Sequence, residues 1–382
     1  MRMSHPDGST VHLSYCTNVH AAEDLAGILE QLDTYAVPIR ERLGTDVLGL
    51  GLWLAAPVAA GLAADVAGRQ RLRRALSERG LEVVTLNGFP YQAFQAPVVK
   101  HAVYQPDWAT PQRLAYTMDL ARLLCDLLPE DAARGSISTL PLAWRDPWDG
   151  PRAAACRRAL DDLAKQLHRL PRTVRVAFEP EPGCIIETTQ EAVALLGDRD
   201  TDVLGLCLDL AHLACAWEEP AAALARLEAG GVPIVKTQIS AALASADPHR
   251  DAAVLSSYAE RRFLHQTRGP HGLSCDDLDE ALSTPGADDQ PWRIHYHVPL
   301  HEPPMPPLQT TVGVLVEALH ELLGGGNALC DHFDVETYTW NVLPPASRPS
   351  GPAQLANGIA AELFFARGQL SALGLQPQGV PS

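Results

Sequence analysis

The chain has 382 residues, an apolar content of 46% and a formal net charge of −16. This length allows one large α/β barrel or two ordinary domains, and the acidic balance argues against nucleic acid or an anionic membrane surface as a partner. Eight cysteines without a CxxC pair, several inside apolar runs, indicate buried reduced thiols and predict a cytoplasmic protein rather than a disulfide framework or a zinc knuckle.

Strands and helices alternate from the start of the chain. Residues 11–15 alternate between apolar and polar side chains as a strand does, and they lead into a polar cluster that ends at His20. Apolar residues at near-helical spacing over 22–43 predict the first crossover helix. Residues 47–68 are apolar enough to raise a membrane span, but their proline, aspartate and many small residues favour a strand over 47–53 followed by a helix. We therefore expect no membrane span.

A third strand, over residues 81–86, ends at Asn87 and opens into a long loop. The loop, residues 90–111, is rich in aromatic and polar side chains and includes His101. Loops of this length in a compact domain are usually functional or disordered, and so aromatic a composition argues against disorder. We expect the loop to form a wall or lid of a pocket.

Three consecutive apolar segments share one design, with a polar side chain where each strand ends. Residues 174–179 end at Glu179, residues 203–208 lead into Asp209, and residues 232–238 end in a Lys-Thr-Gln sequence. Their spacing of about 30 residues is typical of successive βα units in a parallel sheet or a (β/α)8 barrel. A fourth strand is predicted over residues 136–142, and the intervening helices over residues 110–128, 152–170, 188–196 and 220–229.

The regular pattern fails after Ser240. Residues 241–291 hold Asp, Gly and Pro clusters and a helical segment at 253–263, which predicts an elaborated loop above the pocket. Residues 292–300 alternate as a strand with His295 and His297 on one face, and we take this strand as an extension of the seventh unit. A strand within residues 328–339 is then the eighth, and helices follow the seventh and eighth units at residues 311–323 and 353–373.

The sequence thus predicts a single (β/α)8 barrel over residues 1–373, with long loops at 90–111 and 241–291 and a tail at 374–382. In such a barrel the carboxyl ends of all strands meet at one mouth. Carboxylates gathered there with an imidazole suit Mn, Mg, Co or Zn, and the donors come from Glu179, Asp209, Gln238, His297 and Glu336. The candidates for binding a small-molecule substrate are His20, Asn87, His101, His212 and Trp340, and the oligomeric state is left open.

These strand ends resemble those of the xylose isomerase-like barrel superfamily, which includes sugar epimerases, hydroxypyruvate isomerases and endonuclease IV. In its sugar epimerases one divalent metal is bound by a Glu, an Asp in a DxxH setting, a His and a Glu on strands five to eight. The resemblance places Glu179, Asp209 with His212, and Glu336 at three of these positions. The strand-seven His is replaced by a segment containing Lys236 and Gln238, so the missing ligand would be Gln238, His297 or His295, and a nearby Lys236 would compete with a metal by charge.

Across its whole length the chain also resembles the EboE-type metabolite-traffic proteins. The resemblance implies a role in making or moving a small metabolite within a conserved bacterial gene cluster. The motifs that carry it as a set are SYCTNVH (14–20), FEPEPG (178–183), LDLAH (208–212), VKTQIS (235–240), IHYHVP (294–299) and VETYTW (335–340).

Three functions are consistent with these residues. The first is a sugar- or polyol-type isomerase or epimerase. In this reaction Glu179 or Glu336 would remove a proton alpha to a carbonyl, and a metal would stabilise the resulting enediolate. His212 and Lys236 would position substrate oxygens, and Lys236 is a further catalytic candidate. The second is a non-catalytic carrier that keeps the barrel mouth as a metabolite pocket. The third is a phosphoesterase of the endonuclease IV type, which would need two or three metals and a basic groove that the acidic charge disfavours.

Overall fold

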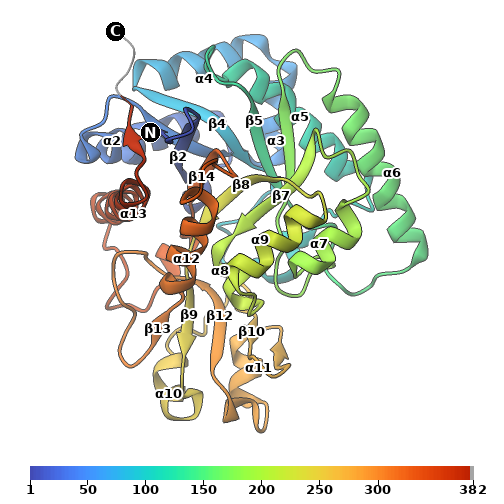
Figure 1. Ribbon diagram of the computed structural model, residues 1–382. Coiled ribbons are helices and arrows are strands. Elements are labelled where there is room, and N and C mark those ends of the chain that lie inside the picture. Colours follow the sequence, from blue (N-terminus) through green and yellow to red (C-terminus); the bar gives the residue numbers. More distant parts are fainter. Residues whose placement is uncertain (379–382) are drawn as a thin grey trace.

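Eight parallel strands form a closed barrel in the computed structural model, which describes residues 1–378 (Figure 1). Each strand pairs in parallel with the one before it, and the last pairs with the first, which closes the barrel. The (β/α)8 prediction is therefore confirmed. In chain order the strands are β2 (Thr10–Cys16), β3 (Leu48–Trp53), β4 (Leu81–Asn87), β5 (Gly135–Thr139), β6 (Val174–Phe178), β7 (Leu204–Asp209), β8 (Ile234–Ile239) and β14 (His332–Val335).

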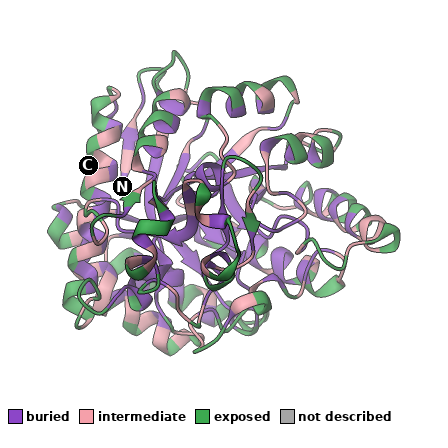
Figure 2. Cartoon of the chain, turned by 90° about the horizontal axis from the view of Figure 1, so that it is seen from below, coloured by how far each residue is buried: buried purple, intermediate pink, exposed green. Residues whose placement is uncertain are grey.

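Helices surround the barrel, and Figure 2 shows buried strands at the centre and exposed outer faces on the helices. The first predicted helix is interrupted by a wider turn at residues 32–36. Thr188 starts α7 with a reciprocal capping box to Glu191, as expected from a threonine cap, whereas the Thr110 hydroxyl donates to the Asp107 carbonyl instead of capping α5. The helices are α1 (Leu25–Gln31), α2 (Val37–Leu43), α3 (Ala56–Ala64), α4 (Val66–Glu78), α5 (Pro111–Leu127), α6 (Gly150–Leu167), α7 (Thr189–Leu196), α8 (Leu210–Cys215), α9 (Pro220–Ala229), α12 (Val312–Leu323) and α13 (Pro352–Ala372).

Between β8 and α12 the chain forms a second, antiparallel sheet, in the order β11-β10-β12-β9-β13, which projects from one end of the barrel (Figure 1). We call residues 241–311 the insertion. The expected helix at 253–263 is misplaced, because Asp247 caps a helix that begins at Pro248 and ends at Leu255. The elements of the insertion are β9 (Ala242–Ser245), α10 (Pro248–Leu255), β10 (Thr267–Arg268), β11 (Ser274–Cys275), α11 (Leu278–Ser283), β12 (Trp292–His297) and β13 (Gln309–Thr310).

The loop after β4 crosses to the insertion. The backbone amides of Val99 and Lys100 donate to the Arg262 carbonyl at 2.7 and 2.8 Å, and the Lys100 side chain forms an ion pair with Asp277. We call residues 89–104 and 258–265 the roof, because they lie together over the mouth of the barrel. The roof joins two segments that are about 160 residues apart in the sequence.

At the other end of the barrel, β1 (Arg2–Ser4) pairs with both β2 and β15 (Gln376–Pro377). Part of the expected tail is therefore a strand, and residues 379–382 of that tail lie outside the described residues. Among residues 1–378, none of the helices combines the length and apolar character needed to cross a membrane.

Candidate metal centre

Four metal-ligand candidates meet at the carboxyl end of the barrel. Glu179 directly follows β6, Asp209 ends β7, Glu336 directly follows β14, and His297 ends β12 of the insertion. All four are buried. The donor atoms of Asp209, His297 and Glu336 lie within 4.8 Å of one another, as do those of Glu179, Asp209 and His212. The structure therefore brings these predicted residues together at one point.

Hydrogen bonds hold one atom of Asp209 and one atom of His297 and leave another atom of each free. Asp209 Oδ1 accepts from the His212 amide (2.9 Å) and from Ser240 Oγ (2.8 Å), while Oδ2 has no partner among residues 1–378. The Nδ1 atom of His297 donates to the Glu336 carbonyl at 2.9 Å, so Nε2 carries the lone pair, and it too has no partner within the described chain. Glu179 Oε2 is likewise buried and unpartnered in this part of the chain. Side chains that are fixed at one atom and free at the other are typical of metal ligands.

Two amides orient the remaining carboxylate. Glu336 Oε1 accepts from Asn18 Nδ2 at 2.7 Å and from Asn87 Nδ2 at 3.0 Å. The sequence identified Asn87 but missed Asn18, although Asn18 belongs to the polar cluster that follows the first strand. Gln238 lies beside Asp209 in the β7–β8 pairing and is buried, and both its amide atoms lack partners among the described residues. Gln238 is therefore available as a further oxygen donor.

Several buried carboxylates lie close together at the centre, and a bound cation would offset their mutual repulsion. Burial and the neighbouring Glu336 and Asp209 raise the pKa of Glu179 well above its usual value, and burial and Asp209 raise the pKa of Glu336. Of the ligand candidates, Glu179 and Glu336 line the small cavity at the centre, whereas Asp209, Gln238 and His297 are not among its lining residues, and neither is Lys236. It lies inside the barrel, where its Nζ is 3.0 Å from Asp334 Oδ2. Because Lys236 is already paired, the unpartnered oxygen and nitrogen donors above it fit a divalent cation.

Two histidines form the side of the centre that faces the insertion. His212 Nδ1 donates to the Pro180 carbonyl at 2.7 Å, and its Nε2 is 2.9 Å from Nε2 of His295. His295 Nδ1 in turn donates to Gln266 Oε1 at 2.8 Å. Burial alone would lower the pKa of His212, but the carboxylates around it, Asp209 first among them, outweigh burial and raise that pKa. Burial and His212 lower the pKa of His295.

Three predicted substrate-binding residues lie outside the cavity. His20 is buried against Tyr35, with ring centroids 4.1 Å apart, and burial lowers its pKa to about 3. His101 is exposed on the roof, and Trp340 donates its indole N–H to Glu362 Oε2 at 3.0 Å. None of these three lines the cavity, which is formed by described residues including Asn87, His212 and the carboxylates. Glu181, in the loop that follows β6, does line it and accepts from the Tyr104 hydroxyl at 2.7 Å.

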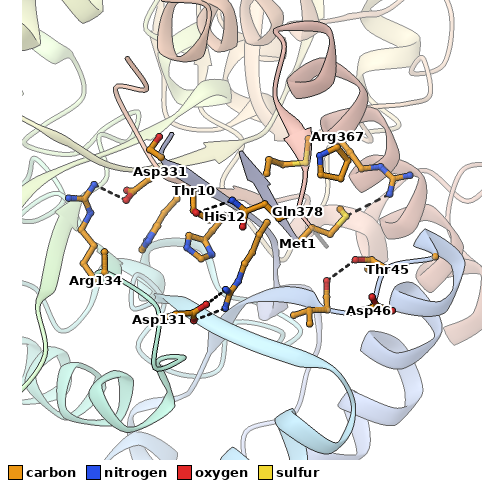
Figure 3. Close-up of a pocket in the computed structure, with 18 residues that line it drawn as sticks. Met1, Thr10, His12, Thr45, Asp46, Asp131, Arg134, Asp331, Arg367 and Gln378 are labelled. Carbon is orange, nitrogen blue, oxygen red and sulfur yellow. Dashed lines mark hydrogen bonds and ion pairs between the residues drawn. The ribbon is translucent and has the colours of Figure 1, made fainter. Parts of the chain in front are cut away.

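The cavity at the centre is small, about 50 Å³, and a larger one of about 720 Å³ lies at the amino-terminal end of the barrel (Figure 3). In the larger cavity two of the three arginines among the described lining residues pair with aspartates: Arg134 with Asp331 at 2.7 Å, and Arg2 with Asp131, whereas Arg367 lies against the Met1 sulfur. Within residues 1–378, the clusters of potential metal ligands all lie at the other end, around Asp209. The chemistry of the barrel therefore points to the smaller cavity.

The sequence model of the xylose isomerase-like TIM barrel family matches residues 41–266, and the chain belongs to this family. The matched segment includes Glu179 and Asp209, whereas β2, β14 and Glu336 lie outside it. No protein of curated function matches the sequence at a significant level.

Solved structures share the fold at low sequence identity. A xylose isomerase-like TIM barrel protein from Mycobacterium smegmatis in complex with magnesium has a TM-score of 0.52 and 14% identity, covering 94% of this chain and 98% of that one. D-Psicose 3-epimerase with D-tagatose from Clostridium cellulolyticum H10 has a TM-score of 0.51 and 15% identity over 94% and 99% of the two chains. The IOLI protein with a bound zinc atom has a TM-score of 0.51 and 13% identity over 95% and 99%. Identities this low establish the fold alone.

Proposed function

We propose that the protein is a metal-dependent isomerase or epimerase of small hydroxycarbonyl compounds of the sugar or polyol type. One observation carries the proposal: buried, unpartnered donor atoms of Glu179, Asp209 and His297 converge beside Glu336. The similar folds of an epimerase that acts with D-tagatose and of barrels that hold magnesium or zinc support it. A mixed set of carboxylate and imidazole donors suits Mn, Co or Zn as well as Mg.

Asp209, His297, Glu336 and Glu179 would hold the cation, with Gln238 as an additional oxygen donor. When bound, a divalent cation supplies positive charge that polarises a carbonyl and an adjacent hydroxyl oxygen. Glu179 and Glu336 then serve as the acid–base pair, one removing the proton alpha to the carbonyl and the other returning one. The two asparagine amides fix Glu336 in place for this transfer.

His212 completes the proposed site as a group that orients a substrate oxygen. Its Nδ1 is held by the Pro180 carbonyl, and its Nε2 lies 2.9 Å from Nε2 of His295, which also lines the cavity. A substrate oxygen would take the place of His295 as the partner of this Nε2. The buried Lys236–Asp334 pair lies beneath the carboxylates, and Lys236 lowers the pKa values of Glu179 and Glu336 from that position. We therefore assign Lys236 to positioning and charge balance rather than to contact with substrate.

At a finer level, we propose a role in the biosynthesis or traffic of a small metabolite, as in the EboE-type proteins. The support is the motif set that spans the chain and the replacement of the strand-seven His by Gln238 together with His297 of the insertion. A carrier without catalysis is the second candidate, and the small cavity under a closed roof favours it. A phosphoesterase lacks comparable support, because the lining described here contains no arginine and a single lysine, Lys100, which is ion-paired.

The proposal is tested by following hydrogen exchange from deuterated water into a panel of ketoses and cyclitol ketones by NMR. The protein is loaded with Mn, Co, Zn or Mg in turn. Exchange at the carbon beside the carbonyl, lost in Glu179→Gln and Glu336→Gln and kept in the exposed control Glu302→Gln, supports the isomerase. Tight ligand retention without exchange in any metal form would move the assignment to the carrier.

A further inference from the structure

The roof side of the cavity forms a wall that is mostly apolar, with Glu181 bonded to Tyr104 at its edge. Phe94 of the roof packs against Phe263, with ring centroids 5.1 Å apart, and against Tyr338 at 5.4 Å. The lining side chains that carry no polar atom are Phe89, Pro90, Phe94, Val99, Val103, Phe263 and Leu264. Every one of them belongs to the roof, so the part of a ligand that faces away from the metal centre meets hydrocarbon.

The polar side chains of the same wall already have partners. The Tyr104 hydroxyl donates to Glu181 and accepts from Gln266 Nε2 at 2.8 Å, and the Tyr338 hydroxyl lies 3.3 Å from His295 Nε2. Lys100 Nζ donates to the Glu260 carbonyl at 3.2 Å and pairs with Asp277.

The unpartnered polar atoms of the lining lie instead on the opposite side. Among the described residues they are Glu179 Oε2 and Asn18 Oδ1, beside the metal centre. The cavity is therefore polar on one side and hydrocarbon on the other.

The charges of the lining argue against an anionic ligand. Glu179, Glu181 and Glu336 contribute carboxylates, and Lys100, the one lysine or arginine among the described lining residues, is held by Asp277 at the edge of the roof. The lining histidines, His212 and His295, are bonded to each other at 2.9 Å. Sites that recognise phosphate usually offer arginine, free lysine or a helix amino terminus. An uncharged ligand suits this lining better.

We propose that the substrate is a compact, uncharged hydroxyketone with its oxygens along one edge and a hydrocarbon face on the other. The proposal rests on the proposed function for the chemistry at the oxygenated edge, and it adds the class of compound. A polyhydroxylated sugar or cyclitol places hydroxyls against Phe94 and Phe263, where they find no partner. Burying an unpartnered hydroxyl weakens binding by roughly tenfold or more for each group.

Binding also requires the roof to move. Pockets for small molecules usually measure about 300–1,000 Å³, whereas this cavity is about 50 Å³ with the roof closed. The two backbone hydrogen bonds from Val99 and Lys100 to Arg262 join the two halves of the roof and would separate on entry. After closure the aromatic side chains would exclude water from the hydrocarbon face of the ligand.

The test compares hydroxycyclohexanone with its pentahydroxy analogue, using calorimetry for binding and NMR for hydrogen exchange on the same metal-loaded protein. We expect at least tenfold tighter binding of hydroxycyclohexanone. Equal or tighter binding of the pentahydroxy analogue, or binding of neither compound, would overturn the inference. Hydrogen exchange is measured separately from binding. A preference for hydroxycyclohexanone without exchange would support the ligand class and contradict the isomerase function. Exchange without this preference would support the isomerase function and contradict the ligand class.

Variants of the wall provide a second readout. Phe94→Asn adds polar atoms to the wall, and Phe94→Tyr adds one hydroxyl while keeping the ring, so the second variant guards against loss of folding in the first. Both are expected to reduce the preference for hydroxycyclohexanone by severalfold. The matched control Phe364→Asn lies on the exposed face of α13 and should leave the preference unchanged. An unchanged preference in both folded Phe94 variants would contradict the assigned wall.

Discussion

The buried pair of Lys236 and Asp334 gives the sharpest prediction about stability. Both side chains are fully buried, their charged atoms are 3.0 Å apart, and Asp334 Oδ1 also accepts from Ser14 Oγ at 2.7 Å. Burial alone would lower the pKa of Lys236, but Asp334 outweighs burial and raises it, so the ammonium stays charged. Lys236→Met leaves a buried carboxylate without a counterion, and breaking a buried pair in this way costs about 3–5 kcal/mol of unfolding free energy.

The double variant Lys236→Met/Asp334→Asn removes both charges. We expect it to be about 1–3 kcal/mol more stable than Lys236→Met alone, because only an incompletely bonded amide then stays buried. Equilibrium denaturation in urea, with refolding checked for each variant, measures both differences. If Lys236→Met loses less than about 1 kcal/mol, or if the second substitution lowers stability further, the pair does not carry the charge balance assigned to it.

Three further predictions concern the surroundings of the centre. Gly51→Ala should destabilise the barrel by several kcal/mol, measured by urea denaturation, because the added Cβ would lie 1.8 Å from Asp334 Oδ2; a loss below about 1 kcal/mol would be inconsistent with this packing. Burial raises the pKa of Glu362 to about 7 from an ordinary 4.5, so its contribution to stability is complete below pH 4.5 and is lost as the pH rises through 7. The free energy of unfolding of the wild type, taken relative to that of Glu362→Gln, should thus fall by about 3 kcal/mol between about pH 4.5 and pH 8 in a series of denaturation measurements. A difference between the two proteins that does not change with pH would contradict this. His297→Gln should lose metal, and Gln238→His should restore part of it by returning an imidazole to strand seven; no rescue in the folded double variant would contradict a shared role.

The barrel was predictable because three consecutive apolar runs, which end at Glu179, Asp209 and Gln238, recur about 30 residues apart, and this pattern is local. The sheet of the insertion was not, apart from β12, since its other strands are two to four residues long and pair across as many as 67 positions of sequence, as Thr310 does with Leu243. A short strand of this kind carries too little alternation to be recognised alone. The helix at Pro248 was misplaced because the Asp247–Pro248 start signal was overlooked in favour of the apolar residues after it.

The strand-end residues Glu179, Asp209 and Glu336 were identified because the carboxyl ends of parallel strands must meet. Lys236 and Gln238 share a face of β8. They are two residue steps apart along the strand, a distance of about 7 Å, so the lysine lies one layer of side chains below the mouth. Residues in loops were less predictable. His20 turns away from the cavity while Asn18, two positions earlier in the same short helical turn, hydrogen-bonds Glu336, because the direction of a side chain beyond a strand end depends on tertiary packing.

The central claim is that Asp209, His297 and Glu336 share one divalent cation. Elemental mass spectrometry of protein purified without chelator and without a metal-affinity tag tests it most directly, with Asp209→Asn, His297→Gln and Glu336→Gln as variants. The matched control His320→Gln removes an exposed imidazole on α12. We predict about one equivalent of divalent metal in the wild type and the control, and its loss in all three variants with the fold retained. A wild type that stays free of metal after loading, or variants that keep a full equivalent, would contradict the account.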